Sequence, residues 1–91
     1  MNVRVEFFGI PRERTGTPET NIEVRGDAAR LSDVFSELVN RYPRLAETCF
    51  ESGRLRPEFR ASIDGQRFVS DPDETVRTGE VILFMSADAG G

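Results

Sequence analysis

The 91-residue sequence contains no histidine, lysine or tryptophan, and its single cysteine is Cys49. One thiol cannot form an intramolecular disulfide, and without histidine it cannot complete a zinc or iron–sulfur ligand set. Metal-dependent catalysis is therefore not expected. No side chain is available as the imidazole base of a nucleophilic site, and the carboxylates are scattered over predicted exposed faces, so we do not expect an enzyme.

The sequence also lacks long apolar runs and clusters of basic residues. It opens directly on the alternating stretch "NVRVEFF", so we expect neither a secretory signal nor a membrane-spanning segment. The net charge is -4 and no run of five basic residues occurs, which argues against a nucleic-acid surface and favours a partner with a basic docking face. These features predict a cytoplasmic protein.

Hydrophobic periodicity predicts an α+β domain. Alternating residues favour strands over "NVRVEFF" and "TNIEVRG", and Asp64-Gly65 favours a tight hairpin turn in "EFRASIDGQRFV". The apolar run "EVILFMS" is typical of a central strand. A hairpin, a helical region and further strands indicate one mixed sheet covered by helices, with the first and last strands parallel neighbours. The segment "DPDETVRTG" reads as a connector.

One helix is marked by a stripe of apolar residues at helical spacing, which consists of Leu31, Val34, Phe35, Leu38, Val39 and Tyr42. Pro43 ends this helix, and Asp27 and Ser32 are both candidate caps at its start. Pro43 can then open a shorter helix over "PRLAETCFESG" that Gly53 terminates. Cys49 faces inward in that helix, which favours a core side chain over a reactive thiol.

The last strand is apolar on both faces, which raises the question of what covers each side. If Ile82 and Phe84 face the helix, the alternate residues from Val81 form an apolar patch on the opposite face of the sheet. Two interpretations are open: a second helix or a loop covers this patch, or the patch is a docking surface with Phe8 as a neighbour.

The sequence ends on Gly90-Gly91, an ending that is unusual for a folded element because ordered glycine loses much conformational entropy. Either this terminus is an incidental extension, or a carboxylate on a thin arm is the working part. The basic residues bear on the choice, because all twelve are arginine. This bias can reflect codon usage, or it can protect an activated carboxyl from side-chain amines.

These parts together resemble the MoaD/ThiS family of ubiquitin-like sulfur carrier proteins, and MoaD more than ThiS. The resemblance rests on "VRVEFFGIPRERTG", a helix ending in "YP", the "DG" hairpin, the strand "GEVILF" and the terminal "GG". It implies a β-grasp domain over residues 1–85, with four to five strands on one main helix and a short second helix, and a flexible tail over 86–91.

The resemblance also implies roles for individual residues. Ile82 and Phe84 would point into the core, and Gly90 and Gly91 would carry the chemistry through the Gly91 carboxylate. The residues expected to contact partners are Phe8, Leu83, Met85, Ser86, Ala87, Asp88 and Ala89. MoaD-like tails commonly carry two prolines and an apolar residue before Ala-Gly-Gly, whereas this chain has "SADAGG".

The function implied is that of a carrier without a bound cofactor, which is a monomer in the absence of its partners. A MoeB/ThiF-like enzyme would spend ATP to adenylate Gly91, and a thiocarboxylate formed there would pass sulfur to a MoaE-like or other synthase subunit, as in molybdenum cofactor biosynthesis. A modifier joined to lysines of target proteins, and an interaction domain with an incidental Gly-Gly end, are the alternatives. The pathway, among molybdopterin, thiamine, cysteine and others, stays open.

Overall fold

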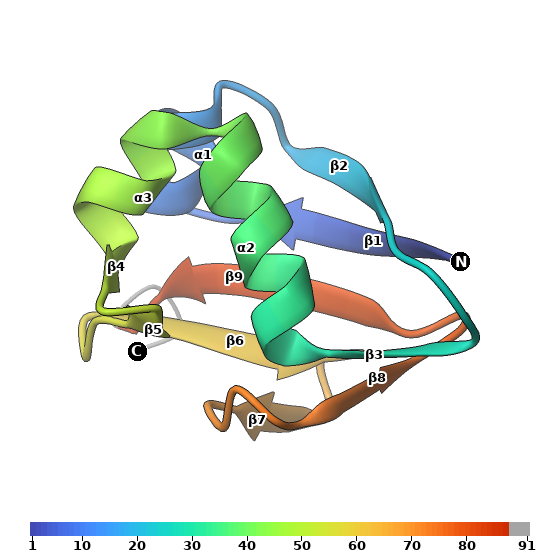
Figure 1. The fold of residues 1–91 in the computed structure, drawn as a ribbon. Helices are drawn as coiled ribbons and strands as arrows, with labels where there is room; N and C mark the ends of the chain where they lie inside the picture. Colours follow the sequence, from blue (N-terminus) through green and yellow to red (C-terminus); the bar gives the residue numbers. More distant parts are fainter. Residues whose placement is uncertain (88–91) are drawn as a thin grey trace.

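The computed structural model describes residues 1–87, in which helices pack on one face of a mixed five-stranded sheet (Figure 1). The predictions for Asp88, Ala89, Gly90 and Gly91 lie outside the described residues. The elements in chain order are β1 (Asn2–Phe7), α1 (Ile10–Thr15), β2 (Glu19–Glu23), β3 (Ala28–Arg30), α2 (Leu31–Arg41), α3 (Pro43–Cys49), β4 (Phe50–Glu51), β5 (Arg54–Leu55), β6 (Phe59–Ile63), β7 (Arg67–Val69), β8 (Thr75–Arg77) and β9 (Val81–Ser86).

The main sheet has the strand order β2-β1-β9-β6-β7. β1 and β9, the first and last strands, are parallel, with Val5 opposite Ile82, and every other pair in this sheet is antiparallel. The predicted hairpin at Asp64-Gly65 is present. Both residues have positive φ, 56° and 69°, and the Gln66 N–H donates to the Ile63 carbonyl at 3.0 Å. The predicted α+β β-grasp architecture is therefore confirmed.

The main helix, α2, buries the apolar stripe that the sequence indicated. Leu31, Val34, Phe35 and Leu38 are all buried under it. Its cap differs from both candidates, because neither Asp27 nor Ser32 caps the helix. The Asp33 carboxylate instead accepts the Arg30 backbone N–H at 3.1 Å, and Asp27 precedes β3, which separates it from the helix.

Two short strand pairs were not predicted. β3 pairs with β8, which lies within the segment "DPDETVRTG" that was predicted as a connector, and Val76 is fully buried there. β4 pairs with β5 directly after α3. Gly53 therefore does not terminate α3, which ends at Cys49; Ser52 and Gly53 instead turn the β4–β5 hairpin with φ of 53° and 79°. Strands of two or three residues contain too little alternation to be recognised.

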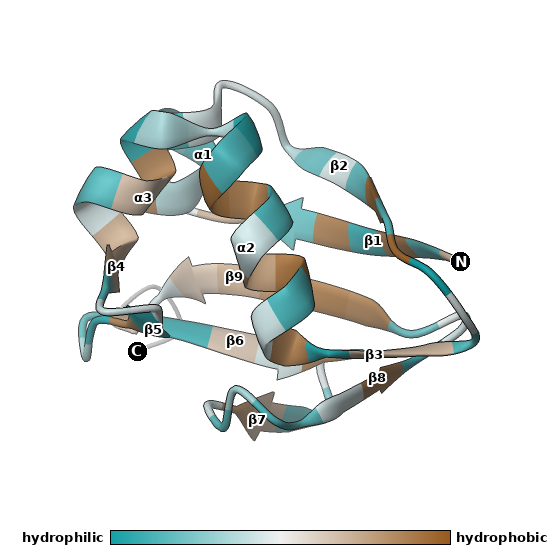
Figure 2. Cartoon of the chain, viewed as in Figure 1, coloured by the Kyte–Doolittle hydropathy of each residue, from teal (hydrophilic) through white to brown (hydrophobic). Residues whose placement is uncertain are grey.

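The core lies between α2, α3 and the inner face of the sheet. Figure 2 shows hydrophobic and hydrophilic residues alternating along β1, while β9 is hydrophobic over most of its length. Phe84 has no exposed surface and packs among the rings of Phe7, Phe35, Phe50 and Phe59. No helix within residues 1–87 is long and apolar enough to cross a bilayer.

Cys49 is a core side chain, as the sequence favoured, and it has no exposed surface. Burial raises the pKa of its thiol from 9.0 to about 11, against the opposing positive charges of Arg14 and Arg56. The folded protein therefore holds this thiol protonated at pH values where a solvated thiol ionises. A thiol in this state is a poor nucleophile.

Replacing Cys49 by alanine is expected to change how stability depends on pH. Below pH 9 the thiol is neutral in both states, so its full contribution is present. Between pH 9 and about 11 the unfolded thiol ionises first, so the wild-type free energy of unfolding falls relative to that of Cys49→Ala. The fall should reach up to about 2–3 kcal/mol. Urea unfolding of both proteins at pH 8 and pH 11 measures it, and a constant difference between them would contradict the assignment.

Candidate functional site

The outer face of the sheet, opposite the helices, carries partly exposed apolar side chains. Ile82 and Phe84 point inward with no exposed surface, which confirms the predicted facing of β9. Leu83 and Met85 therefore lie on the outer face, where both are half-buried. Phe8 follows β1 beside them and is 41% exposed. The helices α1, α2 and α3 leave this face uncovered (Figure 1), so no helix of residues 1–87 covers the patch. Its use as a docking surface stays a prediction.

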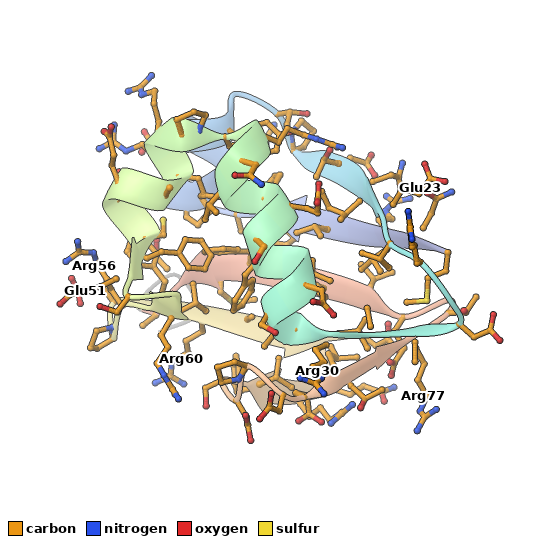
Figure 3. The ribbon with its side chains drawn as sticks, in the orientation of Figure 1. Glu23, Arg30, Glu51, Arg56, Arg60 and Arg77 are labelled. Atoms are coloured by element: carbon orange, nitrogen blue, oxygen red, sulfur yellow. The ribbon has the colours of Figure 1, made fainter. Side chains whose placement is uncertain are left out.

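The apolar surface continues across β6 to β7. Ser62 lies between Leu83 on one side and Phe68 on the other, and the Phe68 side chain is 63% exposed. Arg60 projects from β6 (Figure 3) and its guanidinium lies over the Phe68 ring, 5.2 Å from the ring centre. Phe8, Leu83, Met85 and Phe68 together are called the apolar strip below. Phe68 was missed, although its alternation with buried Val69 in "RFV" would have placed it on this face.

Charged side chains border the apolar strip. On the β1 side, Arg4 contacts the carboxylates of Glu6 and Glu19 at 3.0 and 2.7 Å. By register Glu6 lies next to Leu83, and on the other side Arg60 lies next to Met85. Exposed ion pairs of this kind add at most about 1 kcal/mol to stability.

The chain leaves the sheet at one end of the apolar strip. The Ala87 N–H donates to the Glu58 carbonyl at 2.6 Å, which continues the pairing of β9 with β6. Ser86, predicted to begin a flexible tail, belongs instead to β9 and is only 6% exposed. Its predicted contact with a partner stays a prediction. Its inward orientation follows from the alternation of β9. Ala87 is half-buried at the point of exit.

Ile10 is an exposed apolar residue at this exit that sequence reasoning missed. It is 39% exposed, it opens α1, and its N–H lies 3.4 Å from the Ser86 hydroxyl oxygen. No strand or helix was assigned to "GIPRERTG" from the sequence, so no facing was predicted for Ile10. With Phe8 on the neighbouring segment, Ile10 gives the exit an apolar border.

Comparison with known proteins gives matches in structure only: no protein-family model and no curated protein sequence matches the chain. The small archaeal modifier SAMP1 of Haloferax volcanii superposes with a TM-score of 0.81 at 21% identity, over 100% of both chains. A putative molybdopterin converting factor subunit 1 from Pyrococcus furiosus gives 0.77 at 26% identity, over 94% of this chain and 97% of that one. The chain has the β-grasp fold of the MoaD/ThiS family.

A further match is found in the BexX/CysO complex of Amycolatopsis orientalis. The TM-score is 0.71 at 20% identity, and the match covers 98% of this chain and 99% of that one. The neighbours thus include small proteins described as a modifier and as a converting-factor subunit. The three matches cover 94–100% of this chain and 97–100% of the neighbours, so the likeness extends over almost the whole domain.

Within residues 1–87 no three His, Cys, Asp or Glu side chains come together to hold a metal ion. The groove between α2, α3 and the β4–β5 turn, about 380 Å³ in volume, is lined only by serine, glycine and apolar residues. The exposed large apolar side chains of residues 1–87, which are Phe8, Ile10 and Phe68, lie on the apolar strip or at the exit beside it.

Proposed function

We propose that this protein is a sulfur carrier whose Gly91 carboxylate is activated by a MoeB/ThiF-like adenylating enzyme and converted to a thiocarboxylate. The observation that supports this most is the position of the exit relative to the apolar strip. Met85 belongs to the strip and Ala87, two residues later, is where the chain leaves the sheet. A partner that binds the strip therefore receives the tail directly beside its binding surface.

The chemistry explains why a partner is needed. A carboxylate is a poor electrophile, and the sequence contains no glycine-rich phosphate loop to bind ATP. In the partner's site a carboxylate oxygen of Gly91 attacks the α-phosphorus of ATP and expels pyrophosphate. The terminal sulfur of a persulfide held by the partner attacks the carbonyl carbon and expels AMP, which gives an acyl disulfide. A second thiol of the partner then attacks the persulfide's inner sulfur, forms a disulfide with it and releases the thiocarboxylate. The resulting thiocarboxylate can pass its sulfur to an acceptor.

The composition of the terminus suits this chemistry. Two glycines allow close approach of the backbone to the walls of a narrow channel, where side chains would collide. The absence of lysine in the sequence leaves no side-chain amine in the carrier to attack the acyl adenylate. We propose a sulfur-accepting synthase subunit, MoaE-like or of another type, as the second partner.

A protein modifier is the second candidate, and the similarity to SAMP1 favours it. In that case the activated Gly91 carboxyl forms an isopeptide bond with lysines of target proteins. Chains linked through side chains of the modifier itself are excluded, because the sequence contains no lysine. Both candidates share the adenylation step and differ only in the acceptor of the acyl group.

The adenylation step is tested by ATP–pyrophosphate exchange with the adenylating enzyme that copurifies from the host. We expect exchange that depends on the carrier and a thiocarboxylate product when sulfide is added. Exchange that is the same with and without the carrier would reject the proposal. Release of AMP only in the presence of target proteins would favour the modifier.

A charge on the apolar strip should weaken the complex with the adenylating enzyme without unfolding the carrier. Leu83→Glu or Met85→Glu places a carboxylate on a half-buried outer position, so the Kd should rise at least about tenfold, because an unpaired charge is costly in an apolar interface. Titration calorimetry measures the Kd, and thermal midpoints should stay within a few degrees. Ser36→Glu, which adds the same charge on exposed α2, is the control. Unfolding of either strip variant would contradict the assigned facing.

A further inference from the structure

The inward row of β9 contains one polar residue at its end. Ile82 and Phe84 in this row are apolar and fully buried, whereas Ser86 is 6% exposed and carries a hydroxyl. A buried hydroxyl without a hydrogen-bond partner is costly. This hydroxyl accepts the N–H of Ile10, 76 residues earlier in the chain, at 3.4 Å. Ser86 therefore connects the end of the last strand to the start of α1.

The start of α1 explains why Ile10 needs this acceptor. The N–H groups in the first turn of a helix have no acceptor within the helix. Gly9 precedes α1 with φ 63° and has no side chain to cap it, while Pro11 has no N–H. The Ile10 N–H is thus the first donor that needs a partner, and Ser86 supplies it from another part of the chain.

Ala87, the residue after Ser86, is held by a different part of the chain. The Ala87 N–H donates to the Glu58 carbonyl, which precedes β6, at 2.6 Å. Two consecutive residues are therefore fixed to two different elements, Ser86 to α1 and Ala87 to the start of β6. β9 thus ends at Ser86, with the start of α1 on one side and the start of β6 on the other.

We propose that Ser86 is a positioning residue for the acyl-transfer chemistry. By joining β9 to α1, its hydroxyl sets the position and direction in which the chain leaves the sheet. The four residues after Ala87 span at most about 14 Å. A carboxylate on so short an arm reaches the reacting ATP only if the exit is fixed. This inference rests on the proposed function, because it concerns the delivery of Gly91 to the adenylating enzyme.

The test compares Ser86→Ala, Ser86→Thr and Ser86→Val in ATP–pyrophosphate exchange with the copurifying enzyme. Thr and Val have nearly the same shape, and only Thr keeps the acceptor oxygen, so this pair separates the hydrogen bond from packing. We expect Ala and Val to lower kcat about tenfold while KM stays within about twofold, because misplacement affects the reaction and the apolar strip is intact. Thr should retain the wild-type kcat. Equal kcat for Thr and Val, or a wild-type kcat for Ala, would overturn the proposal.

A second arm uses the isolated carrier and does not depend on the activating enzyme. Amide hydrogen exchange at Ile10 and Ala87 should become about fivefold faster in Ser86→Ala and Ser86→Val than in Ser86→Thr. Ser36→Ala, which removes an exposed hydroxyl from α2, should leave the hydrogen exchange of both amides unchanged. If the wild-type carrier is not adenylated, the proposed function fails. If the rate of amide hydrogen exchange at Ile10 and Ala87 is the same in Ser86→Ala as in the wild type, the positioning role is overturned.

Discussion

Truncation of Phe84 to alanine is expected to lower the free energy of unfolding by about 3–5 kcal/mol. The ring lies at the centre of the core with ring centroids of Phe50, Phe7, Phe35 and Phe59 at 5.7, 6.3, 6.4 and 6.5 Å. These rings come from four other elements, so they cannot all move into the space left behind. A domain of this length is stable by roughly 5–14 kcal/mol, so the loss is a large part of the total.

Phe68→Ala provides a matched control for this prediction. It removes the same atoms from a ring that is 63% exposed on the outer face and contacts Arg60. Equilibrium urea unfolding at 25 °C measures both variants, and the loss for Phe68→Ala should stay below about 1 kcal/mol. Similar losses in the two variants would show that the inner and outer faces of the sheet have been assigned incorrectly.

Deletion of Gly91, or addition of one residue after it, is expected to abolish adenylation. The acyl group is carried by the Gly91 carboxylate under the proposed function, and a change of one residue moves the carboxylate by about 3.4 Å from the reacting ATP. Misplacement by about 1 Å can already cost a hundredfold in rate. ATP–pyrophosphate exchange should therefore fall to the enzyme's background.

The truncated carrier should remain folded and should still bind the enzyme. The apolar strip is unchanged, so the variant lacking Gly91 should inhibit exchange by the wild-type carrier with an inhibition constant close to the wild-type KM. Its thermal midpoint should equal that of the wild type. Normal adenylation of either altered terminus would reject both the carrier and the modifier hypotheses, and would leave an interaction domain with an incidental Gly-Gly end.

The long, periodic elements of the fold could be predicted from the sequence. The apolar stripe from Leu31 to Leu38 repeats at helical spacing over two turns. Burial of this stripe fixes which side of α2 faces the sheet. The turn at Asp64-Gly65 was predictable because positive φ at two successive residues strongly favours this pair. Alternation alone did not decide which face of β9 is inward; the family resemblance supplied that, and the burial of Ile82 and Phe84 confirms it.

The missed features depend on contacts between distant parts of the chain. Val76 is buried because β8 pairs with β3 about 47 residues earlier, and three residues show no clear period. Ser86 lies inward by the alternation of β9, but no local pattern reveals that its hydroxyl meets the start of α1. Phe68 could have been placed on the outer face from its alternation with Val69, but its position beside Ser62 and Leu83 follows only from the register of the strands. Ile10 is exposed at the exit because α1 begins there.

The most direct test of the proposed carrier function is the intact mass of the protein purified from its own host, followed by fragmentation of its C-terminal peptide. The carrier hypothesis predicts a fraction of molecules with one oxygen replaced by sulfur at Gly91, and loss of this fraction when the adenylating enzyme is absent. Gly91 could instead be found only as an unmodified carboxylate, both in the native host and in a host strain that lacks the adenylating enzyme, or only as an isopeptide on lysines of other proteins. Either result would contradict the sulfur-carrier account.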